Sequence, residues 1–194
     1  MKKILLALML MLGLGASAQL SAQTTQWTND KAHSRVGFEV KHGGVSFTSG
    51  HFGDFDIQVT SSGKNYQGTQ ILATIKTQSI NTGIEARDNH LRSADFFNAA
   101  TQPEMKFQST RFVVKGKDKV VVYGNLTLAG VTQRVVLQGR LVGDVTNPKG
   151  QRTAGFRLNG TIKRSDFNFG TKFAPALIGN EVSIIIDAEF SPAN

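Results

Sequence analysis

Cysteine is absent from the 194-residue chain, which excludes a disulfide framework, a thiolate zinc site and a thiol nucleophile. Beyond its first residues, the chain also lacks any apolar run near the roughly 20 residues that a membrane-spanning helix needs. It has no G-x-S-x-G nucleophile elbow, no glycine-rich phosphate loop and no histidine pair spaced as on a zinc-binding helix. We therefore expect no catalytic residue, no metal and no cofactor.

The N-terminus has the organisation of a secretory signal. Two lysines precede an apolar run over residues 4–14, and small residues follow it. We expect cleavage after residue 18, or alternatively after residue 22, and a single domain over residues 19–194. The protein is then exported to the periplasm or secreted.

Basic residues outnumber acidic ones by 22 to 14, and loss of Lys2 and Lys3 with the signal leaves 20 against 14. Apart from a cluster at 115–119, the basic residues are scattered and do not form a patch with exposed aromatic residues. We therefore expect no nucleic-acid partner. A solvated basic surface of this kind favours, at most, peripheral contact with an anionic membrane.

Apolar and polar residues alternate along most of the remaining chain, as in half-buried β-strands. The alternation predicts about eight strands, with a further short one near residue 27, over residues 35–42, 53–59, 70–77, 104–109, 120–128, 135–144, 154–163 and 182–190. Short turns between them imply antiparallel neighbours. Because a long meander with one apolar face has to hide its edges, the pattern predicts an all-β, antiparallel up-and-down barrel, with a two-sheet sandwich as the alternative.

Two segments interrupt the alternation. Residues 88–97 predict a short helix with Asp88 as its N-cap, and residues 164–180 predict a long loop rich in phenylalanine. Aromatic side chains on a bare loop are unfavourable in water. We therefore expect both segments to cover ends of the barrel.

Small residues on the inward faces of the strands suggest a cavity. Gly124, Gly139, Gly143 and Gly160 would leave volume that a plugged barrel fills, although such glycines also mark bulges or bends that closure requires. The other inward residues are apolar, so we expect an apolar ligand. The expected lining residues are Phe38, Val40, His42, Phe55, Ile57, Ile75, Phe107, Leu126, Leu137, Phe156, Leu158, Ile184 and Ile186.

A channel through such a barrel suits a long ligand. Strands of about nine residues, at about 3.3 Å each, give a length of about 30 Å. Burying about 20 methylene groups at about 0.8 kcal/mol each offers about 16 kcal/mol. Association costs about 4–15 kcal/mol, so a long chain is retained and a short one is not.

The stretch ARDNHLRSADFFN, residues 86–98, combines charged and aromatic side chains. Arg87, Arg92 and Asp95 could simply pair with one another on a helix. Alternatively, the stretch binds a polar or phosphate headgroup, because a guanidinium can bond two oxygens at once. The expected residues of the barrel mouth are Arg87, His90, Leu91, Arg92, Phe96, Phe167 and Phe169.

Seven stretches in order resemble the YceI-like family, exported bacterial proteins with a lipocalin-like barrel, and the resemblance covers essentially the whole mature chain. They are residues 30–42, 79–82, 87–97, 103–110, 124–132, 164–167 and 178–182. The resemblance implies a polyisoprenoid or similar long amphiphile inside the barrel, frequent homodimerisation and no established catalysis. One departure is Asn168 after R-S-D-F, where the family usually has glycine, although asparagine tolerates a left-handed backbone.

The sequence therefore favours an exported carrier or binding protein for a long-chain amphiphile. Two alternatives remain open at this point. One is an exported enzyme acting on a lipid or amide through His42 or His90. The other is a stress-protective protein whose barrel is plugged by its own side chains.

Overall fold

The structure is a computed structural model that describes residues 24–62, 66 and 68–193. The predicted signal and both cleavage sites lie outside these residues. The described elements, in chain order, are β1 Thr24–His42, β2 Ser46–Phe52, β3 Phe55–Ser62, β4 Gln70–Lys76, η2 Thr77–Ser79, β5 Ile80–Asn81, α1 Glu85–Arg92, β6 Glu104–Lys115, β7 Lys119–Leu128, β8 Val131–Thr146, β9 Arg152–Lys163, η3 Arg164–Phe167 and β10 Ile178–Pro192.

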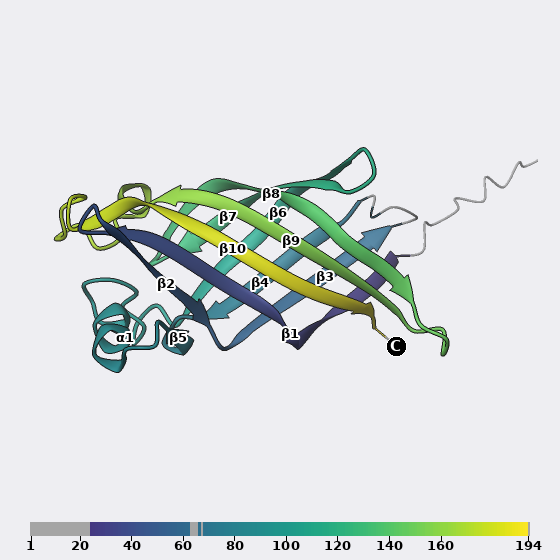
Figure 1. Cartoon of the computed structure of the whole chain (residues 1–194), viewed down its shortest axis with the longest axis horizontal. Coiled ribbons are helices and arrows are strands. Elements are labelled where there is room, and N and C mark those ends of the chain that lie inside the picture. The colour runs from purple at the N-terminus through teal and green to yellow at the C-terminus, as the bar shows by residue number, and fades with distance from the viewer. Residues whose placement is uncertain (1–23, 63–65, 67, 194) are drawn as a thin grey trace, which may run out of the picture.

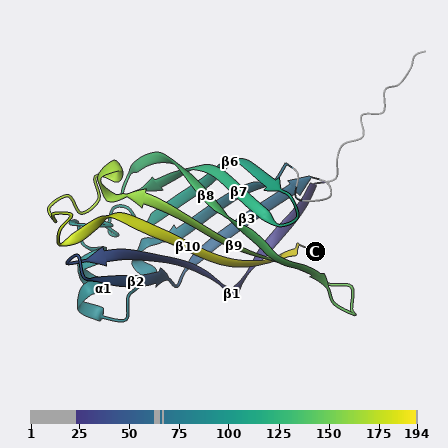
Figure 2. The same ribbon diagram turned by 45° about the horizontal axis from the view of Figure 1, so that its top comes forward.

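The strands form one antiparallel sheet that closes on itself (Figure 1). Pairing runs β10-β9-β8-β7-β6-β4-β3-β1, and β10 also pairs with β1, so eight strands complete the cylinder. Seen from the second direction, the strands cross the long axis of the barrel obliquely (Figure 2). The predicted all-β barrel is confirmed, and the sandwich alternative is wrong because a single sheet encloses the interior.

Strand β1 is much longer than predicted because a bulge joins two pairing segments. Its register with β10 shifts between Asp30 and Arg35. The residues before the bulge pair with β3, and those after it pair with β2. Sequence reasoning missed β2 and β5, since β2 is rich in small and polar residues and β5 has only two residues.

Three of the four inward glycines, Gly124, Gly139 and Gly160, are packed so closely against neighbouring groups that they leave no open space. A Cβ on Gly124 would lie 2.4 Å from the Phe107 ring, and one on Gly139 would lie 1.9 Å from the Arg157 carbonyl oxygen. None of the four predicted glycines lines the cavity described below. Gly124 and Gly143 also adjoin register shifts of the sheet. The interpretation of these glycines as cavity-forming is therefore wrong.

Both interrupting segments lie at the same end of the barrel (Figure 1). Helix α1 occupies Glu85–Arg92 and not residues 88–97, and its N-cap is Ile84. Asp88 is buried inside the helix, where its Oδ1 accepts hydrogen bonds from the backbone N–H (2.9 Å) and the hydroxyl (2.5 Å) of Thr82. Within the described residues, no helix combines the length and apolar character of a membrane span.

The second segment forms η3 and a loop over residues 168–177, hereafter the mouth loop. Asn168 opens this loop with φ 53° and ψ 29°. The left-handed conformation expected of this asparagine is confirmed, so the turn survives without the glycine.

Candidate ligand-binding cavity

The barrel encloses a cavity of about 420 Å³. All eight barrel strands contribute lining residues, and almost all of these are apolar. The volume lies in the range of small-molecule sites, and an apolar wall offers water few hydrogen bonds. A barrel plugged by its own side chains would have no such space, so that alternative is wrong.

Twelve of the thirteen predicted lining residues face the cavity: Phe38, Val40, His42, Ile57, Ile75, Phe107, Leu126, Leu137, Phe156, Leu158, Ile184 and Ile186. Phe55 is the exception. It begins β3 and is packed within the core, 4% exposed, without reaching the cavity wall. Alternation identifies the inward face of a strand but not which inward side chains neighbours cover, and this explains the error.

The cavity opens at the α1 end of the barrel. Its solvent-exposed lining residues are Lys41, His42, His90 and Leu177, which come from the end of β1, from α1 and from the mouth loop. At the opposite end, the lining residues Trp27 and Thr69 are buried. We call the open end the mouth and the opposite end the closed end.

A polar and aromatic network seals the closed end. The Tyr66 hydroxyl donates to Asp144 Oδ2 at 2.6 Å, and Arg152 donates to both carboxylate oxygens at 2.8 and 2.6 Å. The Arg152 guanidinium lies 5.0 Å from the Trp27 ring centroid and 5.6 Å from that of Tyr66. Burial, together with Asp144, raises the pKa of Tyr66, and Arg152 lowers the pKa of Asp144. The network therefore favours a neutral phenol and an ionised carboxylate.

Aromatic side chains from α1, the turn after it and the mouth loop meet at the mouth. The rings of Phe96 and Phe173 stack with centroids 5.0 Å apart and planes 7° apart. The His90 ring meets both edge-on, at 5.1 and 5.5 Å. Phe169 lies 5.5 Å from Phe96. All four line the cavity, so this cluster forms an apolar rim around its entrance.

One carboxylate ties the mouth loop to α1. Asp95 accepts from Lys172 Nζ at 2.5 Å, and the His90 Nε2 lies 3.3 Å from its other oxygen. Lys172, and then His90, lower the pKa of Asp95. The three side chains are exposed or partly exposed, so these contacts contribute little to the stability of the fold.

The two predicted arginines of the mouth have different positions. Arg87 lines the cavity, and its Nε and Nη2 donate to the Thr82 hydroxyl (2.8 Å) and carbonyl (2.9 Å). Its Nη1 has no hydrogen bond within the described residues. Arg92 does not line the cavity, because it donates to backbone oxygens such as that of Ile80 at 3.0 Å and anchors α1 to β5. The predicted pairing of both arginines with Asp95 is wrong.

Of the other predicted mouth residues, Leu91 also lines the cavity. Phe167 does not, because it lies deeper in the core, where it is 1% exposed. Sequence reasoning selected it because it stands in the aromatic loop segment, but η3 carries it behind the cavity wall.

Arg164, which was not selected as a site residue, organises the mouth loop. It is 5% exposed, and burial lowers its pKa. Its guanidinium donates to five backbone oxygens, those of Gly179 (2.9 Å), Phe169 (2.9 Å), Gly170 (2.8 Å), Phe173 (3.2 Å) and Ile178 (2.6 Å). The motif R-S-D-F was visible in the sequence, but arginine is so rarely buried that no pattern indicated this role.

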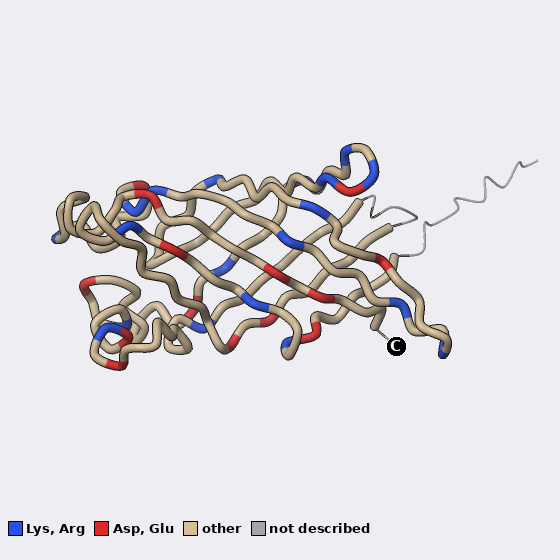
Figure 3. The backbone as a smooth tube through the Cα atoms, viewed as in Figure 1, with Lys and Arg blue, Asp and Glu red and all other residues tan. Residues whose placement is uncertain are grey.

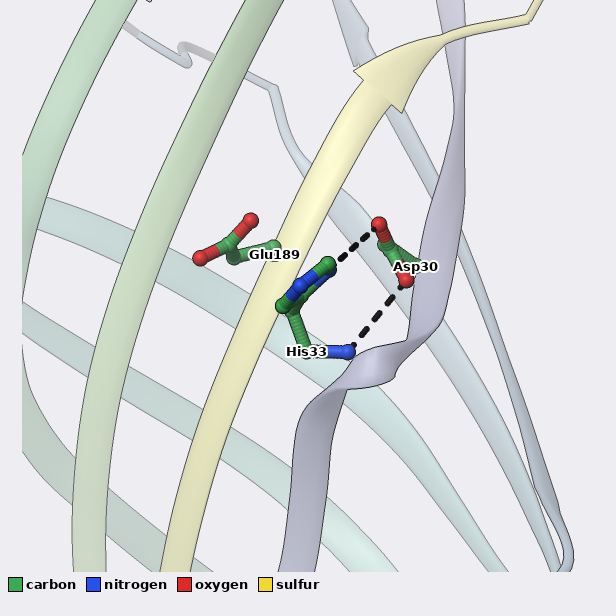
Figure 4. A group of neighbouring side chains, drawn as sticks. All are labelled: Asp30, His33 and Glu189. Carbon is green, nitrogen blue, oxygen red and sulfur yellow. Dashed lines mark hydrogen bonds and ion pairs between the residues drawn. The ribbon is translucent and has the colours of Figure 1, made fainter.

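One group of described side chains has the composition and spacing of a metal site. The ligand atoms of Asp30, His33 and Glu189 lie within 4.8 Å of one another, next to the bulge between β1 and β10 (Figure 4). His33 Nδ1 is 2.9 Å from Asp30 Oδ2, and Asp30 Oδ1 accepts from the Ala32 N–H at 2.9 Å. These hydrogen bonds shape the bulge, and none of the three residues lines the cavity.

The chain is similar to proteins of one family over nearly its whole described length. The model of the YceI-like domain matches residues 27–190. Protein YceI of Salmonella arizonae is 42% identical over 171 residues, which cover 87% of this chain and 88% of the relative. The crystal structure of a Campylobacter jejuni YCEI protein is 34% identical, with a TM-score of 0.73, and the match covers 85% of this chain and 96% of that one.

A more distant solved structure shares the fold. It is a polyisoprenoid binding domain from Saccharophagus degradans, with 17% identity and a TM-score of 0.62 over 86% of this chain and 98% of that one. At this identity the likeness establishes the barrel architecture only. The family match and the bacterial relative, taken together with the barrel, establish that the chain belongs to the YceI-like family.

Proposed function

We propose that the protein binds a long-chain amphiphile, a polyisoprenoid or similar lipid, with its chain in the cavity and its polar end at the mouth. The observation that carries this proposal is the asymmetry of the cavity. It is apolar along its length, sealed at the Trp27 end and open beside α1. An amphiphile has the same asymmetry. Its polar end is well hydrated at an open mouth, whereas transfer of its apolar chain from water into the cavity lowers the free energy.

The mouth offers suitable partners for a polar end. Arg87 lines the cavity, and its Nη1 has no hydrogen-bond partner among the residues that the structure describes. His90 and His42 are exposed at the same opening. A guanidinium and an imidazole donate hydrogen bonds to hydroxyl, carbonyl or phosphate oxygens. These groups would fix the orientation of the ligand, while contact with the apolar wall would supply most of the affinity.

The related proteins support a binding role over catalysis. The Saccharophagus degradans domain is described as polyisoprenoid binding, and this chain shares its barrel. His90 is hydrogen-bonded to Asp95 and enclosed by phenylalanine rings, an arrangement that positions the mouth loop. This supports carriage of the ligand without chemical change.

The test is native mass spectrometry of protein purified from its own host, compared with two variants of adjacent residues. Ile184 lines the cavity, whereas Ile185 is absent from the lining. We expect a bound amphiphile in the unmodified protein and at least about a tenfold lower bound fraction in Ile184→Asp, because a carboxylate in an apolar cavity is costly. Ile185→Asp should keep the ligand.

Two results would contradict this binding site. Protein that is consistently empty after purification from the host would argue against carriage altogether. Equal loading of folded Ile184→Asp and Ile185→Asp would place the ligand somewhere other than the barrel interior. Circular dichroism of both variants verifies that the barrel has formed.

We propose further that the mature protein acts outside the cytoplasm, in the periplasm or after secretion. The N-terminal sequence motivates this proposal, with two lysines, an apolar run and small residues in order. N-terminal sequencing of the protein from fractionated host cells should find Gln19 or Gln23 as the first residue. A protein that begins at residue 1 in the cytoplasmic fraction would contradict the proposal.

A further inference from the structure

Two loops lie side by side at the mouth. The turn between β1 and β2 occupies residues 43–45, and the mouth loop ends at Leu177. The Gly43 N–H donates to the Leu177 carbonyl at 2.9 Å and joins the two. Both loops sit at the same end of the barrel (Figure 1). We call residues 43–47 and 174–177 together the rim patch.

The rim patch exposes apolar side chains to an unusual degree. Val45 is 90% exposed, Phe47 64% and Leu177 50%. Residues 174–176, Ala-Pro-Ala, are exposed as well. The turn between β1 and β2 carries no acidic or basic residue, while such residues are spread along the strands (Figure 3). In a soluble protein, apolar residues gathered at one end indicate a surface that contacts something apolar.

The cavity identifies the chemistry of that contact. Leu177 belongs both to the rim patch and to the cavity lining, so the apolar surface is continuous from the tip of the molecule into the barrel. A long-chain amphiphile is barely soluble in water and resides in a bilayer. A mouth pressed against the bilayer would let the chain pass between the two apolar phases without crossing water.

We infer that the rim patch inserts into the surface of a lipid bilayer and docks the mouth on the membrane from which the ligand is taken or to which it is returned. This inference rests on the proposed function, because the cavity ligand is what calls for a bilayer. Lys41 fits the same geometry. It is exposed, lies across from Phe47 in the β1–β2 pairing, and would place its ammonium group at the level of lipid phosphates while Phe47 enters the acyl boundary.

The experiment is flotation of the full protein with vesicles of phosphatidylethanolamine and phosphatidylglycerol. The test variant is the double substitution Val45→Ser and Phe47→Ser. A matched control exists on β8, where Val142 and Val145 are 61% and 63% exposed beside Asp144 at the closed end. Removing two inserting side chains should lower the vesicle-bound fraction at least about tenfold, whereas Val142→Ser with Val145→Ser should leave it unchanged.

Insertion itself can be measured with one fluorescent residue. Trp27 is the single tryptophan and is buried at the closed end, so it gives a constant background. Tryptophan introduced by Phe47→Trp should shift its emission to the blue on vesicles and be quenched by brominated lipids. Val142→Trp should do neither.

The outcomes separate docking from ligand binding. Docking is overturned if the protein does not float with vesicles, if both double variants lose binding equally, or if the rim variant loses only self-association in sedimentation velocity, since the patch would then bind a second copy. Native mass spectrometry reports the ligand independently. An empty cavity with rim-dependent flotation contradicts the proposed function and leaves docking standing, whereas a filled cavity without flotation contradicts docking alone.

Discussion

The two ends of the barrel are held by different kinds of interaction. At the closed end, side chains bond to side chains, because Tyr66, Asp144 and Arg152 form one network over the Trp27 ring. At the mouth, a single buried side chain, that of Arg164, bonds to backbone oxygens of the mouth loop and the start of β10. The closed end is therefore sealed by groups that fill it. The mouth is shaped by one buried side chain that holds the backbone of the mouth loop and also belongs to the cavity lining.

This difference suits a site with a single entrance. Rings and paired charges fill the closed end, and an apolar ligand offers no replacement for their hydrogen bonds, so the seal resists entry. The mouth loop is fastened to α1 by the exposed Lys172–Asp95 pair and by ring contacts. Exposed pairs contribute little to stability, so the ring contacts supply most of the resistance to widening of the mouth.

The largest expected effect comes from removing the group that shapes the mouth. Arg164→Ala leaves the buried carbonyls of Phe169 and Gly170 without donors. Each unsatisfied buried acceptor costs about 1–3 kcal/mol, so we expect the free energy of unfolding to fall by about 3 kcal/mol or more. Urea unfolding followed by circular dichroism measures it.

A matched arginine serves as the control for this first prediction. Arg157 is exposed and pairs with Asp187 on the outer surface of the barrel. Arg157→Ala should leave the unfolding midpoint almost unchanged. If both variants lost the same stability, the special role of Arg164 in the comparison of the two ends would be wrong.

A smaller effect is expected at the closed end. Tyr66→Phe removes the hydrogen bond to Asp144 but keeps the ring and the Asp144–Arg152 pair. We expect a loss of about 1–2 kcal/mol in the free energy of unfolding and no loss of bound ligand. Thermal unfolding and native mass spectrometry measure the two quantities. Loss of ligand with intact stability would show that the closed end takes part in binding.

The same residue predicts a dependence on alkaline pH. The pKa of Tyr66 is raised in the folded protein, so its neutral form is favoured by folding. This contribution is complete below the unfolded-state pKa of about 10 and is lost as the pH rises from there toward the folded-state pKa. The stability difference between the unmodified protein and Tyr66→Phe should therefore shrink above about pH 10. A constant difference would contradict the network.

Particular residues show what the sequence could and could not predict. The barrel and most of its lining were predictable because alternation with period two assigns a face to residues such as Ile184 and Ile186 on every long strand. The closed end was not predictable, since Trp27, Tyr66, Asp144 and Arg152 come from distant segments and only the closed sheet brings them together.

Two single residues at the mouth were also not predictable. Asp88 was wrongly predicted to be an N-cap because a capping aspartate and a buried hydrogen-bond acceptor look the same in sequence. Arg164 was missed for the reason that buried arginine is rare.

The smallest expected effect tests how much the ion pair between Asp95 and Lys172 restricts the mouth. Asp95→Asn removes the charge that holds Lys172 and weakens the link between α1 and the mouth loop. Stability should hardly change, but release of a preloaded amphiphile to acceptor vesicles should be about two- to fivefold faster.

The same ion pair predicts a dependence on acidic pH. Lys172 lowers the pKa of Asp95 in the folded protein. The stabilisation by the ion pair is therefore complete above the unfolded-state pKa of about 3.9 and is lost as the pH falls through the lower folded-state pKa. Release from the unmodified protein should therefore approach the rate of Asp95→Asn only in strong acid. Equal release rates at neutral pH would mean that the ring stack of Phe96 and Phe173, and not the ion pair, closes the mouth.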